Sequence, residues 1–209
     1  MSPKPDDVFE SEAWARGFRR VAGIDEAGRG PLAGPVVAAA VILPRRFRLA
    51  GLRDSKLLSE TQREHLYAQL LAGALDIGVG VVEAGVIDAV NILEATRLAM
   101  VQAVQRITPP PDYLLLDAVI LPSLPIEQRA VIKGDRLSVS IAAASVVAKV
   151  LRDRLMARAH VCYPQYGFLT HKGYGTAEHL RQLERYGPCK LHRRSFRPVL
   201  EGAGGRDRA

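Results

Sequence analysis

The sequence has little cysteine and no long apolar run. Its 209 residues include two cysteines, Cys162 and Cys189, which excludes a disulfide framework and a paired CxxC motif. The longest apolar stretches, Val36–Leu43 and Ile141–Val150, are shorter than the ~20 residues that a membrane span needs. Met1–Glu10 carries prolines and acids instead of an apolar signal segment. We therefore expect a cytoplasmic protein with no membrane partner.

The chain does have positive charge and enough apolar residues for a core. Lys and Arg outnumber Asp and Glu by 29 to 22, which gives a formal net charge of +7 and favours a polyanionic partner such as nucleic acid. The composition, 48% hydrophobic and 24% charged, is that of an ordinary globular domain. A domain of this size buries roughly 70% of its unfolded surface, so a substantial core can form.

The apolar pattern predicts an alternation of strands and helices. Strands are expected at Arg20–Asp25, Val36–Leu43, Asp76–Glu83, Tyr113–Asp117 and Ile126–Ile132. Helices are expected at Ser59–Leu71, Asn91–Ile107, Ser138–Arg158 and Thr176–Tyr186. Because a short segment with turn residues joins the first two strands, they are expected to be antiparallel. The fold class is therefore α/β, with a mixed sheet flanked by helices and a small C-terminal helical extension.

Four acids stand at the ends of these predicted elements. Asp25 and Glu26 follow the first strand, Asp117 ends a strand of leucines, and Asp135 precedes a long helix. Since successive strand residues point to opposite faces, Asp25 and Glu26 can share one site only if the strand stops there. Clustered carboxylates raise one another's pKa unless a cation lies between them. The alternative is that each acid is a helix cap or a surface charge, and it is strongest for Asp135.

Oxygen ligands of this kind indicate a hard divalent cation, Mg²⁺ or Mn²⁺. In phosphodiester chemistry, two such ions ~3.5–4 Å apart activate water and stabilise the leaving oxygen. A dinucleotide-binding turn at Gly28, Gly30 and Gly34 is a weaker alternative, because a strand rather than a helix follows it. A zinc site is also weaker, because its candidate ligands match no paired-ligand spacing. Those candidates are His160, Cys162, His171, Cys189 and His192.

The segment Gly23–Val36, Gly-Ile-Asp-Glu-Ala-Gly-Arg-Gly-Pro-Leu-Ala-Gly-Pro-Val, resembles the signature of bacterial ribonuclease HII. The similarity covers about residues 20 to 198. It continues through Asp54-Ser55-Lys56, Asn91-Ile92-Leu93, Leu116-Asp117, Lys133-Gly134-Asp135, Ala142–Ser145, Lys149, Arg152-Asp153, Tyr163-Pro164, Tyr174 and His192–Phe196.

This resemblance implies a ribonuclease H-like fold and an endonuclease that acts on RNA–DNA hybrids and on ribonucleotide-containing duplex DNA. It implies cleavage on the 5′ side of a ribonucleotide, including a single one embedded in DNA, which leaves 3′-hydroxyl and 5′-phosphate ends. It identifies Asp25, Glu26, Asp117 and Asp135 as the metal-binding catalytic acids. No obligatory protein partner is expected.

The resemblance also implies a substrate-binding set. Gly28-Arg29-Gly30 matches the segment that recognises the 2′-hydroxyl, the group that separates RNA from DNA. Tyr174 matches a tyrosine that stacks on the next sugar, although Tyr163 and Tyr166 lie in the same segment. Phosphate contacts are expected from Lys56, with Lys172, Arg193 and Arg194 as further candidates. Solvated surface charge is the alternative for each of these cations.

We divide the chain into three parts. Residues 1–18 are expected to form a polar N-terminal arm, and residues 19–198 the ribonuclease H-like catalytic domain. Within it, residues from about 160 to 198 are expected to bind substrate. The glycine-rich segment Arg197–Ala209 is expected to be disordered, and residues 199–209 are assigned to the tail.

Three other functions stay open from the sequence. The related ribonuclease HIII usually carries an N-terminal substrate-binding domain and a different glycine motif, and only 24 residues precede Asp25. A non-catalytic nucleic-acid-binding module would use the basic, tyrosine-bearing segment Tyr163–Phe196. A different polynucleotidyl transferase, such as a DNA nuclease or recombinase, would use the same carboxylates.

Overall fold

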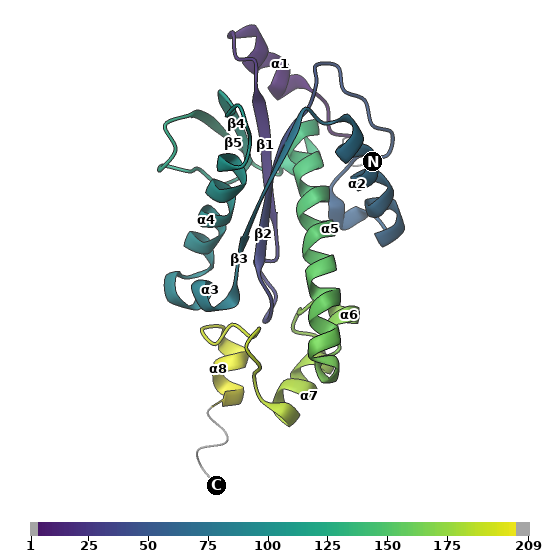
Figure 1. The fold of residues 1–209 in the computed structure, drawn as a ribbon, viewed down its shortest axis with the longest axis vertical. Helices are drawn as coiled ribbons and strands as arrows, with labels where there is room; N and C mark the ends of the chain where they lie inside the picture. Colours follow the sequence, from purple (N-terminus) through teal and green to yellow (C-terminus); the bar gives the residue numbers. More distant parts are fainter. Residues whose placement is uncertain (1–3, 204–209) are drawn as a thin grey trace.

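A five-stranded mixed sheet runs through the protein, with helices on both of its faces (Figure 1). The structure is a computed structural model and describes residues 4–203. The strands are β1 (Val21–Ala27), β2 (Val36–Ile42), β3 (Asp76–Val82), β4 (Tyr113–Asp117) and β5 (Glu127–Val131). The α-helices are α1 (Val8–Ala15), α2 (Glu60–Gly73), α3 (Ala84–Val90), α4 (Ile92–Gln105), α5 (Val139–Cys162), α6 (Phe168–His171), α7 (Ala177–Tyr186) and α8 (Arg197–Ala203). Short 3₁₀ turns are η1 (Ser55–Leu57), η2 (Gly134–Arg136) and η3 (Pro164–Tyr166).

The strand order is β3-β2-β1-β4-β5. β1, β2 and β3 form an antiparallel meander, whereas β4 pairs with β1, and β5 with β4, in parallel. The expected antiparallel pairing of the first two strands is therefore confirmed. The parallel half brings the carboxyl ends of β1 and β4 to one edge of the sheet, where active sites of open α/β sheets form.

The two faces of the sheet carry separate apolar cores. Ile24, Ala38 and Leu116 pack with buried residues of α4 on one face. Ala39 and Val41 pack with the alanine-rich face of α5 and with α2 on the other. Gly23 lets α5 approach β1 closely, since a Cβ there would lie 2.1 Å from a backbone carbon of Ser140. Small residues on α5 thus allow the close helix–sheet contact that its composition predicts.

The five strands and the four long helices lie where the pattern predicts them, within a few residues. Ser59 and Gln62 form the expected capping box of α2, and Asn91 caps α4. The predicted end of the first strand at Asp25 is wrong, because β1 continues to Ala27 and pairs Glu26 with Ala38.

Helices also form where none was expected. Residues 8–15 form α1 instead of an arm, because the buried Glu10 carboxylate accepts hydrogen bonds from Ser138 Oγ (2.5 Å) and Ser140 N (2.9 Å). The expected loop of residues 163–175 contains η3 and α6. Residues 197–203 form α8 rather than disordered chain, and Val199 is fully buried with Leu32 and Leu183. The rest of the expected tail, residues 204–209, lies outside the described residues.

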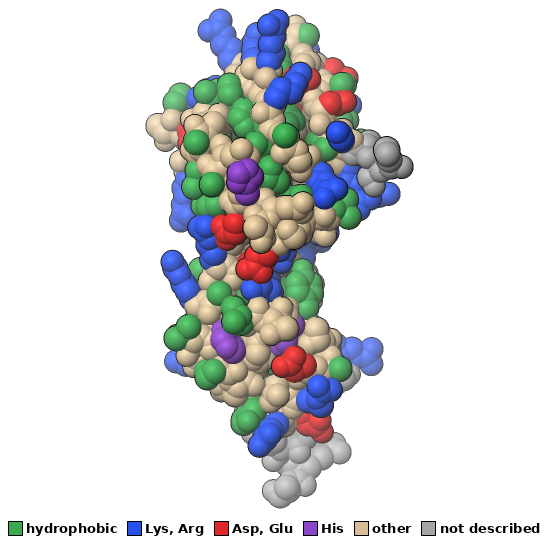
Figure 2. Space-filling view, turned by 90° about the vertical axis from the view of Figure 1, so that its right-hand side faces the viewer, with side chains coloured by type: hydrophobic (Ala, Val, Ile, Leu, Met, Phe, Trp, Pro, Cys, Tyr) green, Lys and Arg blue, Asp and Glu red, His purple; other side chains and the backbone are tan. Residues whose placement is uncertain are grey.

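Helices α6, α7 and α8 form a lobe beyond one end of the sheet; in Figure 1, α6 lies beside the last turns of α5, and α7 and α8 lie below. Figure 2 shows the α2 side of the molecule, where Lys and Arg side chains are spread over both the upper body and this lobe. In residues 4–203, no helix combines the length and the apolar character that a bilayer crossing requires.

Candidate metal centre and ribose site

Asp25 and Asp117 lie side by side at the carboxyl edge of the parallel strands. The register pairs Ile24 with Leu116, and both of these residues face the α4 core. Because side chains alternate along a strand, the next residue of each strand points to the opposite face, toward α5. Asp25 is 4% exposed, and the Ser145 hydroxyl of α5 favours its ionised form by lowering its pKa.

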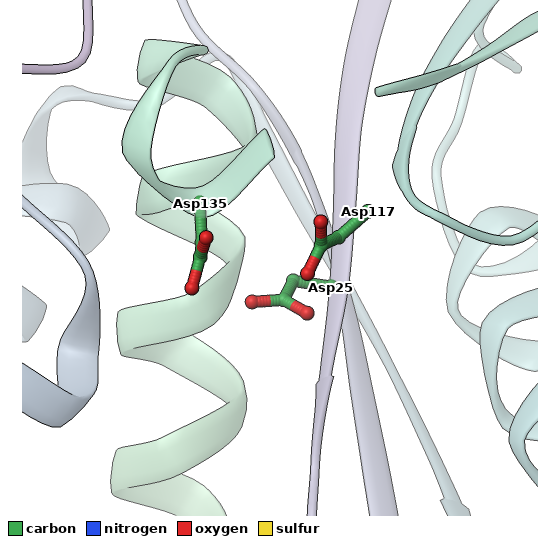
Figure 3. A group of neighbouring side chains, drawn as sticks. All are labelled: Asp25, Asp117 and Asp135. Atoms are coloured by element: carbon green, nitrogen blue, oxygen red, sulfur yellow. The ribbon is translucent and has the colours of Figure 1, made fainter. Parts of the chain in front are cut away.

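Asp135 completes a group of three acids. It lies in η2, directly before α5, and is 4% exposed. One carboxylate oxygen from each of Asp25, Asp117 and Asp135 lies within 4.8 Å of the other two (Figure 3). Within residues 4–203, this is the one group of His, Cys, Asp or Glu side chains whose ligand atoms are close enough to hold a metal ion. The backbone N–H of Gly134 donates to Asp117 at 2.8 Å and links η2 to β4.

Glu26 is not part of this group. Since β1 remains regular through Ala27, strand alternation directs Glu26 to the face opposite Asp25. Its side chain is 11% exposed, and its Oε1 lies 3.3 Å from Arg29 Nη1. Its Oε2 is buried and has no hydrogen-bond partner among the described residues. Such an orphaned carboxylate oxygen costs free energy unless a donor or a cation meets it.

The acids raise one another's pKa in the absence of a cation. Burial, and then the charges of Glu26 and Asp117, raise the pKa of Asp25 well above its usual value. Burial also raises the pKa of Glu26, although the Arg29 guanidinium opposes the shift. The pKa of Asp135 is raised by burial and by Asp54 and Asp117.

These residues fit a divalent metal. The donor set consists only of carboxylate oxygens, which suits hard cations. A bound cation would favour the ionised form of every acid in the group, and the orphaned oxygen of Glu26 offers a further ligand atom.

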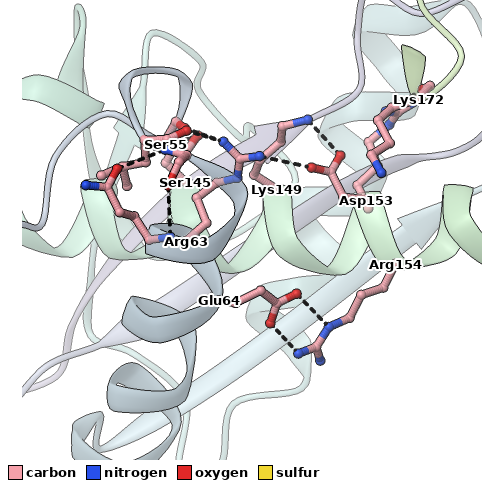
Figure 4. Close-up of polar contacts among 12 residues, drawn as sticks. Ser55, Arg63, Glu64, Ser145, Lys149, Asp153, Arg154 and Lys172 are labelled. Atoms are coloured by element: carbon pink, nitrogen blue, oxygen red, sulfur yellow. Dashed lines mark hydrogen bonds and ion pairs between the residues drawn. The ribbon is translucent and has the colours of Figure 1, made fainter. Parts of the chain in front are cut away.

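A polar network connects Ser145 of α5 to η1 and α2 (Figure 4). Ser145 Oγ lies 2.8 Å from Ser55 Oγ, and Arg63 of α2 donates to the Ser55 carbonyl at 3.2 Å. Arg63 also pairs with the buried Asp153 of α5 at 3.5 Å, and Lys149 donates to the same carboxylate at 2.7 Å. This network fixes the hydroxyl that contacts Asp25.

The glycine loop after β1 is held by two buried arginines. Arg193 donates to the carbonyls of Gly28 (2.5 Å), Arg29 (2.9 Å) and Gly34 (2.9 Å). Arg152 donates to the carbonyls of Pro35, Ala33 and Lys172 at 3.0–3.1 Å. Apart from the family resemblance, no sequence pattern indicates this role of Arg152. The expectation that Arg193 contacts phosphate is wrong, because Arg193 is fully buried and its N–H groups bond these carbonyls.

Tyr174 lies against the same loop. It is 44% exposed, and a Cβ on Gly30 would be 3.8 Å from Tyr174 Cε1. Tyr166 instead is buried, and its hydroxyl donates to the Gly187 carbonyl at 2.6 Å. Tyr163 packs with Tyr166 in the core of the lobe. Of the three tyrosines, Tyr174 is therefore the one placed beside Gly30.

Of the remaining predicted phosphate contacts, only Lys56 lies beside the acid group. Lys56 is exposed, and its Nζ lies 3.6 Å from Asp135 Oδ2, so the structure brings it to the metal centre. Arg194 is exposed and Lys172 is half-buried. Among the described residues, the histidines of the zinc alternative do not form a group that could bind a metal ion. His171 bonds the Tyr166 carbonyl, and His192 bonds the Cys189 N–H and His179. Asp54, to which the sequence resemblance assigned no role, is buried and pairs with Arg136 at 3.2 Å.

A mixed five-stranded sheet with clustered acids at the ends of two central parallel strands defines a ribonuclease H-like, metal-dependent nuclease. The crystal structure of the ribonuclease H2 from Pyrococcus horikoshii OT3 has a TM-score of 0.72 and 26% sequence identity to this chain, and covers 91% of this chain and 100% of its own. The RNase HII of Archaeoglobus fulgidus, solved in a PCNA:RNase HII complex, has a TM-score of 0.68 and 26% identity, and covers 83% of this chain and 92% of its own.

The chain belongs to the Ribonuclease HII family, whose sequence profile matches residues 22–199. The Ribonuclease HII of Geobacillus kaustophilus is 58% identical over 193 residues, which cover 92% of this chain and 74% of the relative. The protein is therefore a type 2 ribonuclease H, a divalent-metal-dependent endonuclease of a family that cleaves the RNA of RNA–DNA hybrids. This assignment decides against the non-catalytic binding module.

Proposed function

We propose that the protein cuts the phosphodiester bond on the 5′ side of a ribonucleotide, including a single ribonucleotide within duplex DNA, and leaves 3′-hydroxyl and 5′-phosphate ends. The observation that carries this proposal is the adjacency of the acid group to the glycine loop. Glu26 belongs to β1 and its ion pair with Arg29 reaches the loop at 3.3 Å. A test of sugar identity can therefore take place next to the bond that is cut.

We propose Asp25, Glu26, Asp117 and Asp135 as the catalytic acids that hold Mg²⁺ or Mn²⁺. When bound, such a cation activates water and stabilises charge on the leaving oxygen. Asp25 is preorganised for this role by Ser145 and by the N–H of Glu26, which donates to its Oδ1 at 2.7 Å. Lys56 is the expected phosphate contact, since its exposed ammonium lies at the rim of the acid group.

We call Gly28-Arg29-Gly30 together with Tyr174 the candidate ribose site. Gly28 has φ +101°, and Gly30 has no side chain between the backbone and Tyr174, so a sugar can approach the backbone closely. The exposed Tyr174 ring offers a flat surface to the neighbouring sugar. Tyr174 lies within residues 160 to 198, which we propose as the substrate-binding part of the domain.

We further propose that the cut requires no obligatory protein partner, because one chain supplies every residue of both sites. The PCNA complex of the A. fulgidus relative is an assembly that this proposal does not need. A cytoplasmic location is part of the proposal. It is supported by the two free cysteines, Cys162 and Cys189, which are typical of a reducing compartment.

The decisive experiment uses a DNA duplex with one ribonucleotide, Mg²⁺ or Mn²⁺ and the purified protein. We expect one cut, 5′ of the ribonucleotide, and a 5′-phosphate product that a DNA ligase can rejoin to a 3′-hydroxyl. The matched controls are the same duplex with only deoxyribonucleotides and the Asp117→Asn protein, neither of which should give product. Equal cutting of the all-DNA duplex would assign the protein to another polynucleotidyl transferase, and an intact ribonucleotide duplex would refute the proposal.

A further inference from the structure

Two adjacent residues, His192 and Arg193, are linked by hydrogen bonds to the two parts of the candidate ribose site, Tyr174 and the loop that contains Gly28-Arg29-Gly30. Arg193 is fully buried, and its guanidinium donates to the carbonyls of Gly28, Arg29 and Gly34. A planar guanidinium presents its donors in a fixed fork, so it holds the three carbonyls in one arrangement. The preceding residue, His192, is 2% exposed and faces the lobe, toward α7.

His192 begins a hydrogen-bonded relay that ends at Tyr174. The Cys189 N–H donates to His192 Nδ1 at 3.0 Å, so this nitrogen is an acceptor and Nε2 carries the proton. His192 Nε2–H then donates to His179 Nε2 at 3.0 Å. The His179 proton is therefore on Nδ1, which donates to the Tyr174 carbonyl at 3.0 Å. Every step of the relay requires a neutral imidazole.

A third histidine fixes the turn before Tyr174 in the same way. His171 Nε2 donates to the Tyr166 carbonyl at 2.6 Å, and its Nδ1 accepts from the Gly173 N–H at 3.2 Å. Its ring stacks on that of His179, with 4.5 Å between centroids. Burial lowers the pKa of His179, and it lowers the pKa of His192 to about 4, in agreement with neutral rings at neutral pH.

The two halves touch each other as well as the relay. The Leu32 N–H donates to the Gly173 carbonyl at 2.8 Å, and Arg193 N donates to the Leu32 carbonyl at 2.8 Å. Gly173 has φ +88°, and a Cβ there would lie 2.4 Å from the Ala33 carbonyl oxygen. The turn that carries Tyr174 therefore packs directly on the loop that follows Gly30.

We propose that His192-Arg193 is a positioning element that sets the gap between the Tyr174 ring and Gly28-Arg29-Gly30, and that His179 transmits its position to Tyr174. Consecutive Cα atoms are about 3.8 Å apart, so a shift of one residue moves the other. The element holds the Tyr174 ring and the glycine loop in one arrangement before substrate binds. This inference rests on the proposed function and adds residues that contact neither metal nor substrate.

The first test compares two substitutions of His179. His179→Leu removes both ring nitrogens, whereas His179→Asn keeps a side-chain N–H near the position of Nδ1. For the single-ribonucleotide duplex we expect His179→Leu to lower kcat by about 100-fold, because a misplacement of about 1 Å at the reacting centre has this effect. KM and the dissociation constant for Mn²⁺, measured by calorimetry, should stay within about 3-fold. His179→Asn should recover most of the lost kcat.

The second test concerns Arg193. Arg193→Lys keeps the charge and loses the fork, so we expect a loss of kcat on the same substrate without a loss of Mn²⁺ affinity. The controls are His65→Asn, an exposed histidine of α2, and Arg106→Lys, whose guanidinium donates to the Val79 carbonyl of the edge strand β3. Both should cleave as the original protein does. Equal losses in His179→Leu and His179→Asn, or unchanged kcat in folded His179→Leu and Arg193→Lys, would overturn the positioning role.

A third test does not depend on activity or on a folded variant. Long-range ¹H–¹⁵N spectra of the original protein at pH 7 should show neutral rings protonated at Nε2 in His192 and at Nδ1 in His179. A charged ring or the opposite tautomer at either position would refute the relay. If the original protein left the ribonucleotide duplex intact, the proposed function would fail while these spectra would still decide whether the relay exists.

Discussion

The metal centre and the candidate ribose site are neighbours, yet they are stabilised in opposite ways. In the metal centre, burial and then neighbouring acidic charges raise the pKa of Asp25 and Asp135. Burial also raises the pKa of the adjacent Glu26, one oxygen of which has no hydrogen-bond partner among the described residues. In the ribose site, Arg152 and Arg193 each donate to three backbone carbonyls. One site requires a cation to complete it, and the other is complete without a ligand.

Under the proposed function, this difference separates metal binding from sugar recognition. A preorganised recognition site lowers the conformational cost of binding and fixes the geometry of the reacting groups. An acid cluster that is unfavourable without metal gains more from metal binding than a neutral site would. Stability and activity should therefore respond differently to substitutions in the two regions.

Asp117→Asn should give the largest effect on activity and should leave stability intact. Loss of one carboxylate ligand removes several kcal/mol of transition-state charge stabilisation, so we expect kcat to fall at least ~10³-fold. The amide oxygen can still accept from the Gly134 N–H, and one fewer charge faces Asp25. In the presence of a chelator, the free energy of unfolding, measured in urea, should be equal to or above that of the original protein. A clear loss of stability would break the comparison.

Arg152→Met should do the reverse and destabilise the fold. The substitution leaves the carbonyls of Ala33, Pro35 and Lys172 without this donor. At about 1–3 kcal/mol for each unpaired buried group, we expect a loss of roughly 3 kcal/mol or more in the free energy of unfolding. Urea titration measures it. The control is Arg154→Met on the same helix, whose ion pair with Glu64 is exposed and should contribute about 1 kcal/mol or less.

The sequence specified the metal centre better than the ribose site, for a physical reason. Asp25, Asp117 and Asp135 stand at predicted element ends, and the parallel register of β1 and β4 then places two of them together. The face on which Glu26 lies depends on where β1 ends, and that end is decided by pairing with β2. Propensity does not reveal such a tertiary effect.

The supports of the ribose site depend on contacts far apart in sequence. Arg193 bonds Gly28 across 165 positions, and Arg152 bonds Ala33 across 119. A basic residue near the end of a basic chain is indistinguishable, in sequence alone, from a solvated or phosphate-binding one. The role of Glu10 was missed for the same reason. A polar N-terminal segment gives no sign that one of its acids is buried and accepts hydrogen bonds from Ser138 and Ser140.

Acid should act on the two regions with opposite signs. Burial depresses the pKa of His192 from 6.5 to about 4, so its stabilising contribution is present above pH ~6.5 and is lost as the pH falls toward 4. The free energy of unfolding should fall by up to about 1.4 kcal/mol per pH unit for this group. The acids have raised pKa values in the folded state, so their protonation in the same direction stabilises the metal-free protein.

Two variants separate these contributions in urea titrations with a chelator between pH 7.5 and 4.5. His192→Gln should flatten the loss of stability at low pH, because the titrating ring is absent. Asp25→Asn should steepen it, because the opposing gain is removed. Identical pH profiles for both variants and the original protein would show that neither region titrates as its burial requires.

Lys56→Gln should give the smallest effect, and it tests where the metal centre ends. The Lys56 side chain is 73% exposed and lies 3.6 Å from Asp135, so it both offsets the acids and is placed to meet a phosphate. We expect KM for the ribonucleotide duplex to rise about 2- to 5-fold, as for an exposed ion contact, with kcat nearly unchanged. The slope of log KM against log salt should fall by about 0.9, the value for one phosphate contact on a duplex.

The same variant gives a second, opposite readout. Because Lys56 lies among acids that await a cation, its removal should strengthen Mn²⁺ binding by a small factor while substrate binding weakens. Lys4→Gln, an exposed lysine outside both sites, is the matched control and should change neither constant. If Lys56→Gln bound Mn²⁺ more weakly, the ammonium would position Asp135 rather than compete with the metal. The metal centre would then be held by a protein cation, as the ribose site is held by Arg152 and Arg193, and the contrast between the two sites would fail.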